Sequence, residues 1–232
     1  MKFRHYYLIV LVTVFSGNAR AAMEEPLIVQ IKADEFETSD SSDQSLTWDG
    51  QAWFGKTLRR FWLKSEGERV HGETEAFELQ ALYSNAVSTY WDFQAGIRHD
   101  FEPSPQLDWA VLGLQGLAPY FFEIETALFL SEEGDLALRL KAEYDLLLTQ
   151  RLILTPEFEV NLYQDDMPDQ ALGSGLADID AGLRLRYEIR REFAPYIGIN
   201  WHEKFNKTAD FASLRGEEVS DTSVIVGLRF WF

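Results

Sequence analysis

A single imidazole among acidic residues is the best candidate for metal chemistry in this sequence. His202 and Lys204 share one face of an alternating segment, and the same alternation puts Asp178, Asp180 and Asp221 on two other segments. We predict that these carboxylates lie at a similar height to the imidazole. Such a group could hold a divalent cation. The alternative is that Lys204 neutralises the acids, because buried charges generally need partners.

The elements that position these residues are long alternating segments. In residues 175–196, GLADIDAGLRLRYEIRREFAPY, charged and apolar residues follow one another. A helix would scatter the charges around its axis, whereas a strand sends successive side chains to opposite faces. The same alternation recurs at 89–101, 135–148, 150–163 and 219–232. The pattern predicts strands well beyond the usual length of about 5–6 residues.

Weaker strands complete the set and predict the architecture. They are expected at 27–36, 46–54, 58–66, 75–84, 107–117, 120–131 and 195–205. The total is twelve, with ten as the alternative, and no helix is expected. Longer polar connections are predicted at 37–45, 67–74, 164–175 and 206–218. Long strands, alternating tight and long connections, and aromatic residues near strand ends are typical of an all-β, antiparallel transmembrane barrel with a polar, charged lumen.

The charged phase of these strands would line the lumen. Its predicted members are Glu123, Glu125, Arg139, Lys141, Glu143, Asp145, Arg151, Glu157, Glu159, Arg184, Arg186, Glu188 and Arg190. One interpretation is a salt-bridge network that plugs the barrel. The other is a narrow polar path, like the charged rings of ion pores. The last strand ends with Phe230 and Phe232 in one phase, which is the usual assembly signal of outer-membrane barrels.

Three further residues could contribute metal ligands. His71 is expected in a polar loop, where it is either solvated or a ligand. Met167 lies in the acidic segment YQDDMPDQ, an external loop that either collects cations or is simply soluble. His99 falls in the lipid-facing phase near a membrane boundary, where an imidazole is an interfacial residue or a ligand.

Composition and the first residues restrict the setting. Residues 1–22 have the layout of a secretory signal peptide, which leaves residues 23–232 as one barrel domain. The chain has no cysteine and no apolar stretch long enough for a membrane-spanning helix. Its 21 basic and 38 acidic residues give a net charge of −17, which argues against nucleic acid as a partner. We expect a protein of the bacterial outer membrane, surrounded by its lipid.

Several long segments resemble the copper resistance protein B family. They include WDGQAWFG (48–55), FWLKSEGE (61–68), LGLQGLAPYFFE (112–123) and GSGLADIDAGLRLRYEIRREFAPYIG (173–198), and the resemblance covers about residues 27–232. It implies an outer-membrane barrel that binds or passes copper ions for copper tolerance, without an organic cofactor. It also implies a periplasmic multicopper oxidase as a partner, besides the barrel-assembly machinery that reads the C-terminal Phe.

Family members often carry an N-terminal extension rich in Met and His. Residues 23–45 hold only Met23 and no His, so we expect the family's barrel without this copper-loading segment. Two other functions stay open at this point. A general small-solute channel or structural barrel would fit the scarcity of Met and His. A barrel lipase would need a Ser–His pair on the outer face; only His99 is placed there, with no serine motif beside it, and we expect no enzyme.

Overall fold

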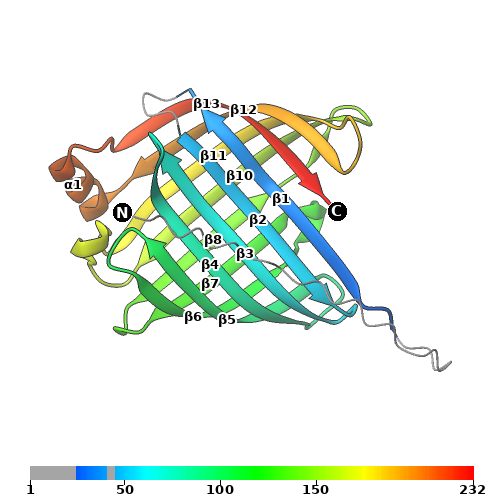
Figure 1. Cartoon of the computed structure of the whole chain (residues 1–232), viewed down its shortest axis with the longest axis horizontal. Helices are drawn as coiled ribbons and strands as arrows, with labels where there is room; N and C mark the ends of the chain where they lie inside the picture. Colours follow the sequence, from blue (N-terminus) through cyan, green and yellow to red (C-terminus); the bar gives the residue numbers. More distant parts are fainter. Residues whose placement is uncertain (1–24, 41–44) are drawn as a thin grey trace, which may run out of the picture.

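The computed structural model describes residues 25–40 and 45–232. The predicted signal peptide, residues 1–22, lies outside this part and stays a prediction. The described strands form one antiparallel sheet that closes into a barrel (Figure 1). The strands are β1 (Ile28–Ser39), β2 (Ser45–Gly55), β3 (Arg59–Val70), β4 (Glu73–Ala86), β5 (Trp91–Glu102), β6 (Leu107–Leu117), β7 (Glu123–Ser131), β8 (Leu136–Glu143), β9 (Leu146–Leu147), β10 (Leu152–Tyr163), β11 (Gly175–Tyr187), β12 (Phe193–Lys204) and β13 (Ser220–Trp231).

The barrel has twelve spanning strands. Of the thirteen strands in the sheet, β8 and β9 both pair with β10 on either side of an interruption at Tyr144 and Asp145, so they act as one. Every other strand pairs with its neighbour in the chain, and β1 pairs with β13 to close the ring. The predicted count of twelve is confirmed, and the alternative of ten is wrong.

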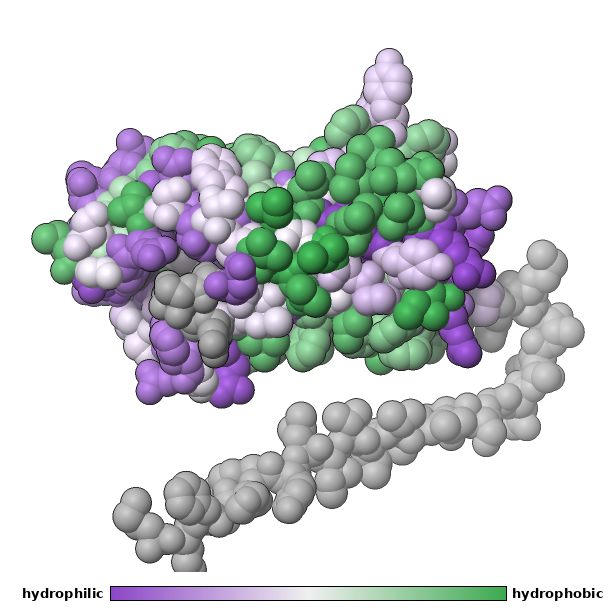
Figure 2. Space-filling model, turned by 90° about the horizontal axis from the view of Figure 1, so that it is seen from above, coloured by the Kyte–Doolittle hydropathy of each residue, from purple (hydrophilic) through white to green (hydrophobic). Residues whose placement is uncertain are grey.

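Alternation separates a lipid face from a lumenal face. On β11, Arg184 and Arg186 are buried inside the barrel, whereas Leu183 and Tyr187 on either side of them are exposed. On β13, Val224 and Val226 are exposed and Ile225 is buried. Figure 2 shows apolar side chains gathered along the wall, with hydrophilic side chains at its ends. The predicted direction of the segment 175–196, apolar side outward and charged side inward, is confirmed.

The two ends of the barrel differ in their connections. The 3₁₀ segment η2 (Pro168–Gln170) and the helix α1 (Asn206–Arg215) lie at one end, and the C terminus lies at the other (Figure 1). The C-terminal end carries short connections at 56–58, 87–90, 148–151 and 188–192, and the short 3₁₀ segment η1 (Pro119–Phe121). Outer-membrane barrels have short periplasmic turns and longer external loops. The end with α1 is therefore external.

Two connections differ from the sequence prediction. The expected loop 67–74 is a turn of His71 and Gly72, whose positive φ values of 51° and 88° suit a tight hairpin. The expected loop 206–218 contains α1, which ends at Gly216 in the left-handed region. Its buried face consists of Thr208 and Ala212, which are weakly hydrophobic, so the sequence pattern did not reveal it. No described helix is long and apolar enough to cross a membrane.

Candidate functional site

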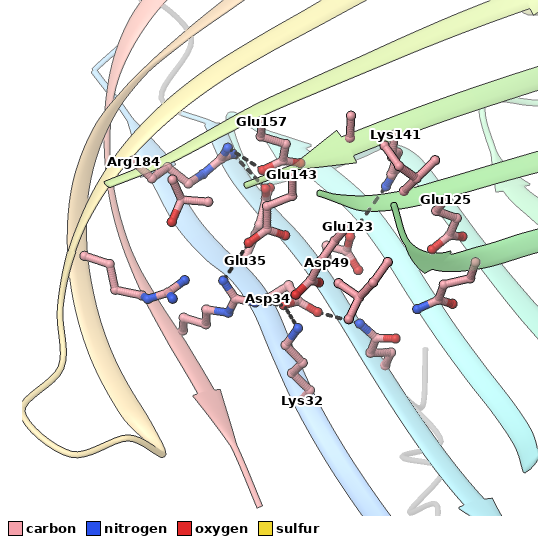
Figure 3. Close-up of a pocket in the computed structure, with 18 of the residues that line it drawn as sticks. Lys32, Asp34, Glu35, Asp49, Glu123, Glu125, Lys141, Glu143, Glu157 and Arg184 are labelled. Carbon is pink, nitrogen blue, oxygen red and sulfur yellow. Dashed lines mark hydrogen bonds and ion pairs between the residues drawn. The ribbon is translucent and has the colours of Figure 1, made fainter. Parts of the chain in front are cut away.

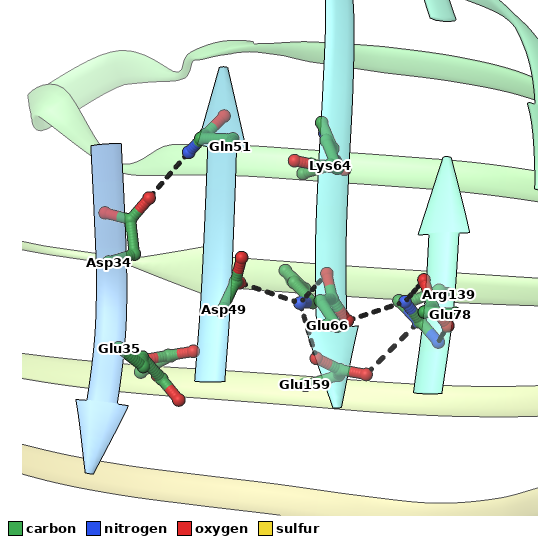
Figure 4. A network of polar contacts seen from close by, with 12 residues as sticks. Asp34, Glu35, Asp49, Gln51, Lys64, Glu66, Glu78, Arg139 and Glu159 are labelled. Atoms are coloured by element: carbon green, nitrogen blue, oxygen red, sulfur yellow. Dashed lines mark hydrogen bonds and ion pairs between the residues drawn. The ribbon is translucent and has the colours of Figure 1, made fainter. Parts of the chain in front are cut away.

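Arg139 on β8 is the centre of a charge network that crosses the lumen. Its guanidinium nitrogens lie 3.1 Å from the carboxylate of Glu66 on β3, 3.0 Å from Glu78 on β4 and 3.3 Å from Glu159 on β10. β8 is not a neighbour of β3 or β4 in the sheet, so two of these contacts span the barrel (Figure 4). Arg98 on β5 adds a second guanidinium, 2.9 Å from Glu78.

Lys141 extends the network two residues along β8. Its Nζ lies 2.9 Å from Glu66, 3.2 Å from Glu159 and 3.5 Å from Asp49 on β2. Lys64 on β3 reaches across to Glu125 on β7. Arg139 and Lys141 on β8 and Lys64 on β3 thus each pair with a carboxylate across the lumen, at successive heights.

A second group of contacts joins β11 to β1 nearby. Arg184 lies 2.8 Å from Glu35, 3.1 Å from Glu37 and 2.7 Å from Glu157. The hydroxyl of Tyr196 donates to Glu37 at 2.8 Å. Glu37 and Arg184 are both buried, so their charges have little access to water and depend on one another.

Toward the periplasmic end, Arg229 repeats this arrangement. Its guanidinium lies 3.0 Å from Asp34 on β1 and 2.8 Å from Glu143 on β8. Arg186 lies 2.7 Å from Asp145 in the interruption between β8 and β9. The contacts with Glu143 and Asp145 again join strands that are not neighbours in the sheet, whereas Asp34 lies on the strand beside Arg229. The cross-lumen pairing favours the interpretation of a salt-bridge plug over an open polar path.

A cavity of about 330 Å³ lies among these groups in the periplasmic half of the barrel (Figure 3). Acidic residues outnumber basic residues on its wall. The acids are Asp34, Glu35, Asp49, Glu123, Glu125, Glu143 and Glu157, and the bases are Lys32, Lys141, Arg184, Arg186 and Arg229. We call this cavity the chamber. Its excess of carboxylates attracts cations.

The lumen also contains an apolar layer, which the sequence analysis did not predict. Trp109 and Val111 on β6 and Phe129 on β7 point inward and are buried. The guanidinium carbons of Arg98 and Arg139 lie 4.9 Å and 5.5 Å from the ring centre of Phe129. Residues 109–114 are apolar in both phases of the strand, and that pattern is the signal that could have indicated an apolar stretch of lumen.

Several members of the network were not among the predicted lumenal residues. They are Asp34, Glu35, Glu37, Asp49, Lys64, Glu66, Glu78, Arg98 and Arg229. The signal for most of them was the polar phase of the weaker strands, for example Lys64 and Glu66 in FWLKSEGE. Three predicted members lie elsewhere: Arg151 and Arg190 are exposed beyond the strand ends, and Glu188 follows the end of β11. The lumenal phase stops where the strands stop.

The residues of the predicted metal site are only partly brought together. His202 Nδ1 lies 3.0 Å from Asp180, and Asp221 is its partner across the β12–β13 register. Asp178 instead accepts a hydrogen bond from Asn161 at 2.8 Å. In the part of the chain that the structure describes, no three His, Cys, Asp or Glu side chains are arranged to hold a metal ion. The four-residue site stays a prediction.

The remaining candidate ligands are dispersed. His71 is exposed in its turn, and His99 lies on the lipid side with Nδ1 2.7 Å from Asp108. Met167 lies in the external connection as expected, but its side chain is not solvated, because it is buried against the apolar layer. The thioether there contacts hydrophobic groups, and the acidic residues of its segment remain at the surface.

The sequence matches one family of known proteins. Residues 27–232 match the family described as "Copper resistance protein B precursor (CopB)". Copper resistance protein B of Escherichia coli is 50% identical over 198 residues, covering 85% of this chain and 67% of that protein. A homolog from Pseudomonas syringae pv. tomato is 47% identical over 201 residues, covering 86% and 68%.

Solved structures support the fold alone. The NanC porin has a TM-score of 0.55 at 12% identity, and the KdgM porin 0.51 at 13%; each match covers 88% of this chain and 99% of the porin. These likenesses confirm an outer-membrane barrel architecture. With the family match over nearly the whole described barrel, the chain belongs to the copper resistance protein B family.

Proposed function

We propose that this barrel binds or passes copper ions across the outer membrane and so contributes to copper tolerance. The chamber is the observation that carries the proposal, because it gives an excess of carboxylates inside a membrane barrel of this family. Copper would be the cargo, not a resident cofactor, and no organic cofactor and no enzymatic step is proposed. The acidic lining raises the local concentration of cations in the lumen.

Copper(II) is the oxidation state that the available ligands suit. Carboxylate oxygens and imidazoles suit copper(II), whereas thioethers and thiolates select copper(I). The chain has no cysteine, and the thioether of Met167 packs in the apolar layer. His202 with Asp180 is an imidazole–carboxylate pair near the external mouth. The chamber supplies carboxylates at the other end.

Passage requires that the cross-lumen pairs open. Arg139 and Lys141 occupy carboxylates that a moving cation would otherwise contact. A copper ion can replace such a side chain at the same carboxylates without leaving them unpaired, so the cost of breaking a buried pair is partly offset. We therefore propose stepwise exchange along the carboxylates instead of flow through an open pore.

Calorimetric titration of the purified barrel with copper(I) and copper(II), each separately, tests binding. Wild type is expected to bind copper(II), and His202→Ala and Asp49→Asn to bind it more weakly. His71→Ala is the matched control, because His71 is exposed in a turn, and it should bind as wild type does. Absence of binding in the wild type would discard the binding proposal. Copper flux into liposomes then tests passage separately.

A general small-solute channel is the second candidate. The scarcity of Met and His beyond residue 22 favours it, since few soft or imidazole ligands are present. Planar-bilayer recording distinguishes the two. We expect near-zero current in simple salt, because the network closes the lumen. Steady open-channel steps without copper would favour the general channel.

We also propose two partners for this barrel. One is a periplasmic multicopper oxidase, which would meet copper at the periplasmic mouth. The other is the barrel-assembly machinery, which would read Phe230 and Phe232 at the end of β13. Their rings lie 5.9 Å apart, and Phe232 is exposed. Co-purification of each partner with the full-length barrel is the direct test.

A further inference from the structure

The connection between β10 and β11, residues 164–174, folds back into the external mouth. Met167 is only 8% exposed and belongs to the same buried apolar cluster as Trp109, Phe129 and Ala137. These three residues lie on β6, β7 and β8, so the connection reaches over the wall beyond its own two strands. The backbones of Met167 and Leu172 bond to each other, which makes the connection a small closed loop.

Helix α1 holds this loop from the other side. The amide of Gly173 donates to the hydroxyl of Thr208 at 2.9 Å, and Thr208 is only 3% exposed. Arg215 at the end of the helix donates to the carbonyl oxygen of Pro168 at 3.1 Å. Ala212 on the helix is 1% exposed. Both segments lie at the external end of the barrel in Figure 1.

Two polar side chains of the loop, Asp166 and Gln170, add to this attachment. Asp166 accepts hydrogen bonds from the ammonium of Lys207 on α1 and from the amide of Ser174, which together lower the pKa of its carboxyl to about 2. Gln170 donates to the carbonyl oxygen of Pro105, in the connection between β5 and β6. The loop is thus bound to two other external connections and to the lumenal wall.

The apolar layer under this loop contacts the charge network. Phe129 belongs to the same cluster as Met167. The guanidinium groups of Arg98 and Arg139 stack over its ring. The chamber lies on the periplasmic side of Arg98 and Arg139. Its wall includes Leu117 and Glu123, which flank a periplasmic turn. The external side of the lumen is therefore covered by apolar groups, while the chamber is nearer the periplasm.

We propose that residues 164–174, held by α1, form an external latch with Met167 as its apolar stopper. The closed latch separates the lumen from the exterior, and it must lift before any solute moves between the two. The identity of that solute rests on the proposed function. The closure itself does not, because it depends only on the contacts of the loop and can be measured without copper.

The absence of cysteine from the chain allows a direct test. Val111→Cys places one thiol under the latch, at a residue that is 2% exposed. Leu214→Cys places one on the outer face of α1, where the side chain is 83% exposed. Each protein, folded in detergent micelles, is treated with a charged methanethiosulfonate reagent. We expect the thiol at position 111 to react at least about tenfold more slowly, as protected sites do.

Two latch variants then open the mouth by different means. Met167→Asp removes the apolar stopper. Gly173→Ala places a Cβ 2.5 Å from Lys207 Cβ and 2.6 Å from the backbone nitrogen of Thr208, which forces the loop away from the helix. The matched control is Gly50→Ala, whose Cβ meets nothing nearer than 3.7 Å. Heat-modified gel mobility confirms that each barrel is folded.

Both latch variants should raise the reaction rate at position 111 at least about fivefold and leave position 214 unchanged, since local opening exposes only the covered site. Gly50→Ala should change neither rate. Equal rates at positions 111 and 214 in the otherwise wild-type barrel would overturn the latch. So would continued protection of position 111 in the folded variants. Failure of copper binding in the separate titration would leave these rates unaffected.

Discussion

Arg139→Gln tests whether the cross-lumen pairs stabilise the barrel. The side chain is 12% exposed and contacts three carboxylates, on β3, β4 and β10. Removing one partner of a buried ion pair costs about 3–5 kcal/mol, because the other charge is left without compensation. Arg98 remains 2.9 Å from Glu78 and limits that loss. We therefore expect the free energy of unfolding to fall by about 3 kcal/mol, the lower end of this range.

Reversible denaturant unfolding in lipid vesicles, followed by tryptophan fluorescence, gives this free energy. Arg139→Lys should fall between wild type and Arg139→Gln, because one ammonium cannot reproduce the forked contact with Glu78. Arg151→Gln is the control, since Arg151 is exposed beyond a strand end and should stay within about 0.5 kcal/mol of wild type.

A double-mutant cycle with Glu78→Gln isolates the pair. If the contact is direct, the two substitutions together should cost less than the sum of each alone, with a coupling of about 1–3 kcal/mol. A loss below about 1 kcal/mol for Arg139→Gln would mean that water or lumenal rearrangement compensates the charges. In that case the network would not be the plug that we infer from its geometry.

Three further predictions concern other parts of the barrel. Trp109→Phe removes the indole hydrogen bond to Asp100, 2.8 Å long, and should lower the free energy of unfolding by about 1 kcal/mol in the same assay. Deleting Phe232 should reduce the folded, heat-modifiable fraction in cells while refolding into vesicles is retained; unchanged assembly in cells would reject the signal. Because the pKa of Asp166 is lowered in the folded state, its contact with Lys207 stabilises above the ordinary aspartate pKa of 3.8 and is lost as the pH falls toward about 2. The difference in thermal unfolding between wild type and Asp166→Asn should thus be constant from about pH 7 to 5 and shrink below about pH 4.

Local periodicity predicted most of the barrel. Alternation is a property of neighbouring residues, so it identified the strands and the inward direction of Arg184 and Arg186. It also gave the correct number of strands, because β8 and β9 read as one alternating segment, 135–148. The turn at His71 and Gly72 was missed because polar residues on both sides resemble a loop.

The features that were not predicted depend on contacts between distant parts of the chain. Arg139 meets Glu66 across 73 residues, and no local pattern tells which carboxylate lies opposite a given cation. The neighbours of Met167 in the sequence are acidic and suggest exposure. Its burial results from the packing of the loop against β6, β7 and β8, which are distant in the sequence. Helix α1 buries Thr208 and Ala212 on one face, but one is polar and the other small, so the buried face gives only a weak hydrophobic pattern.

The pairing of β8 with the opposite wall restricts how the barrel can enter the membrane. A hairpin of β7 and β8 inserted alone would expose Arg139 and Lys141 to hydrocarbon, and a lipid-facing Arg or Lys near the bilayer centre costs about 2–4 kcal/mol. Their carboxylate partners on β2, β3 and β4 become available only when the early strands curve round to face them. Strand-by-strand insertion is thus unfavourable for this sequence. Curvature, closure and neutralisation of the interior must develop together, which requires a protected site where a partly formed barrel is kept from lipid.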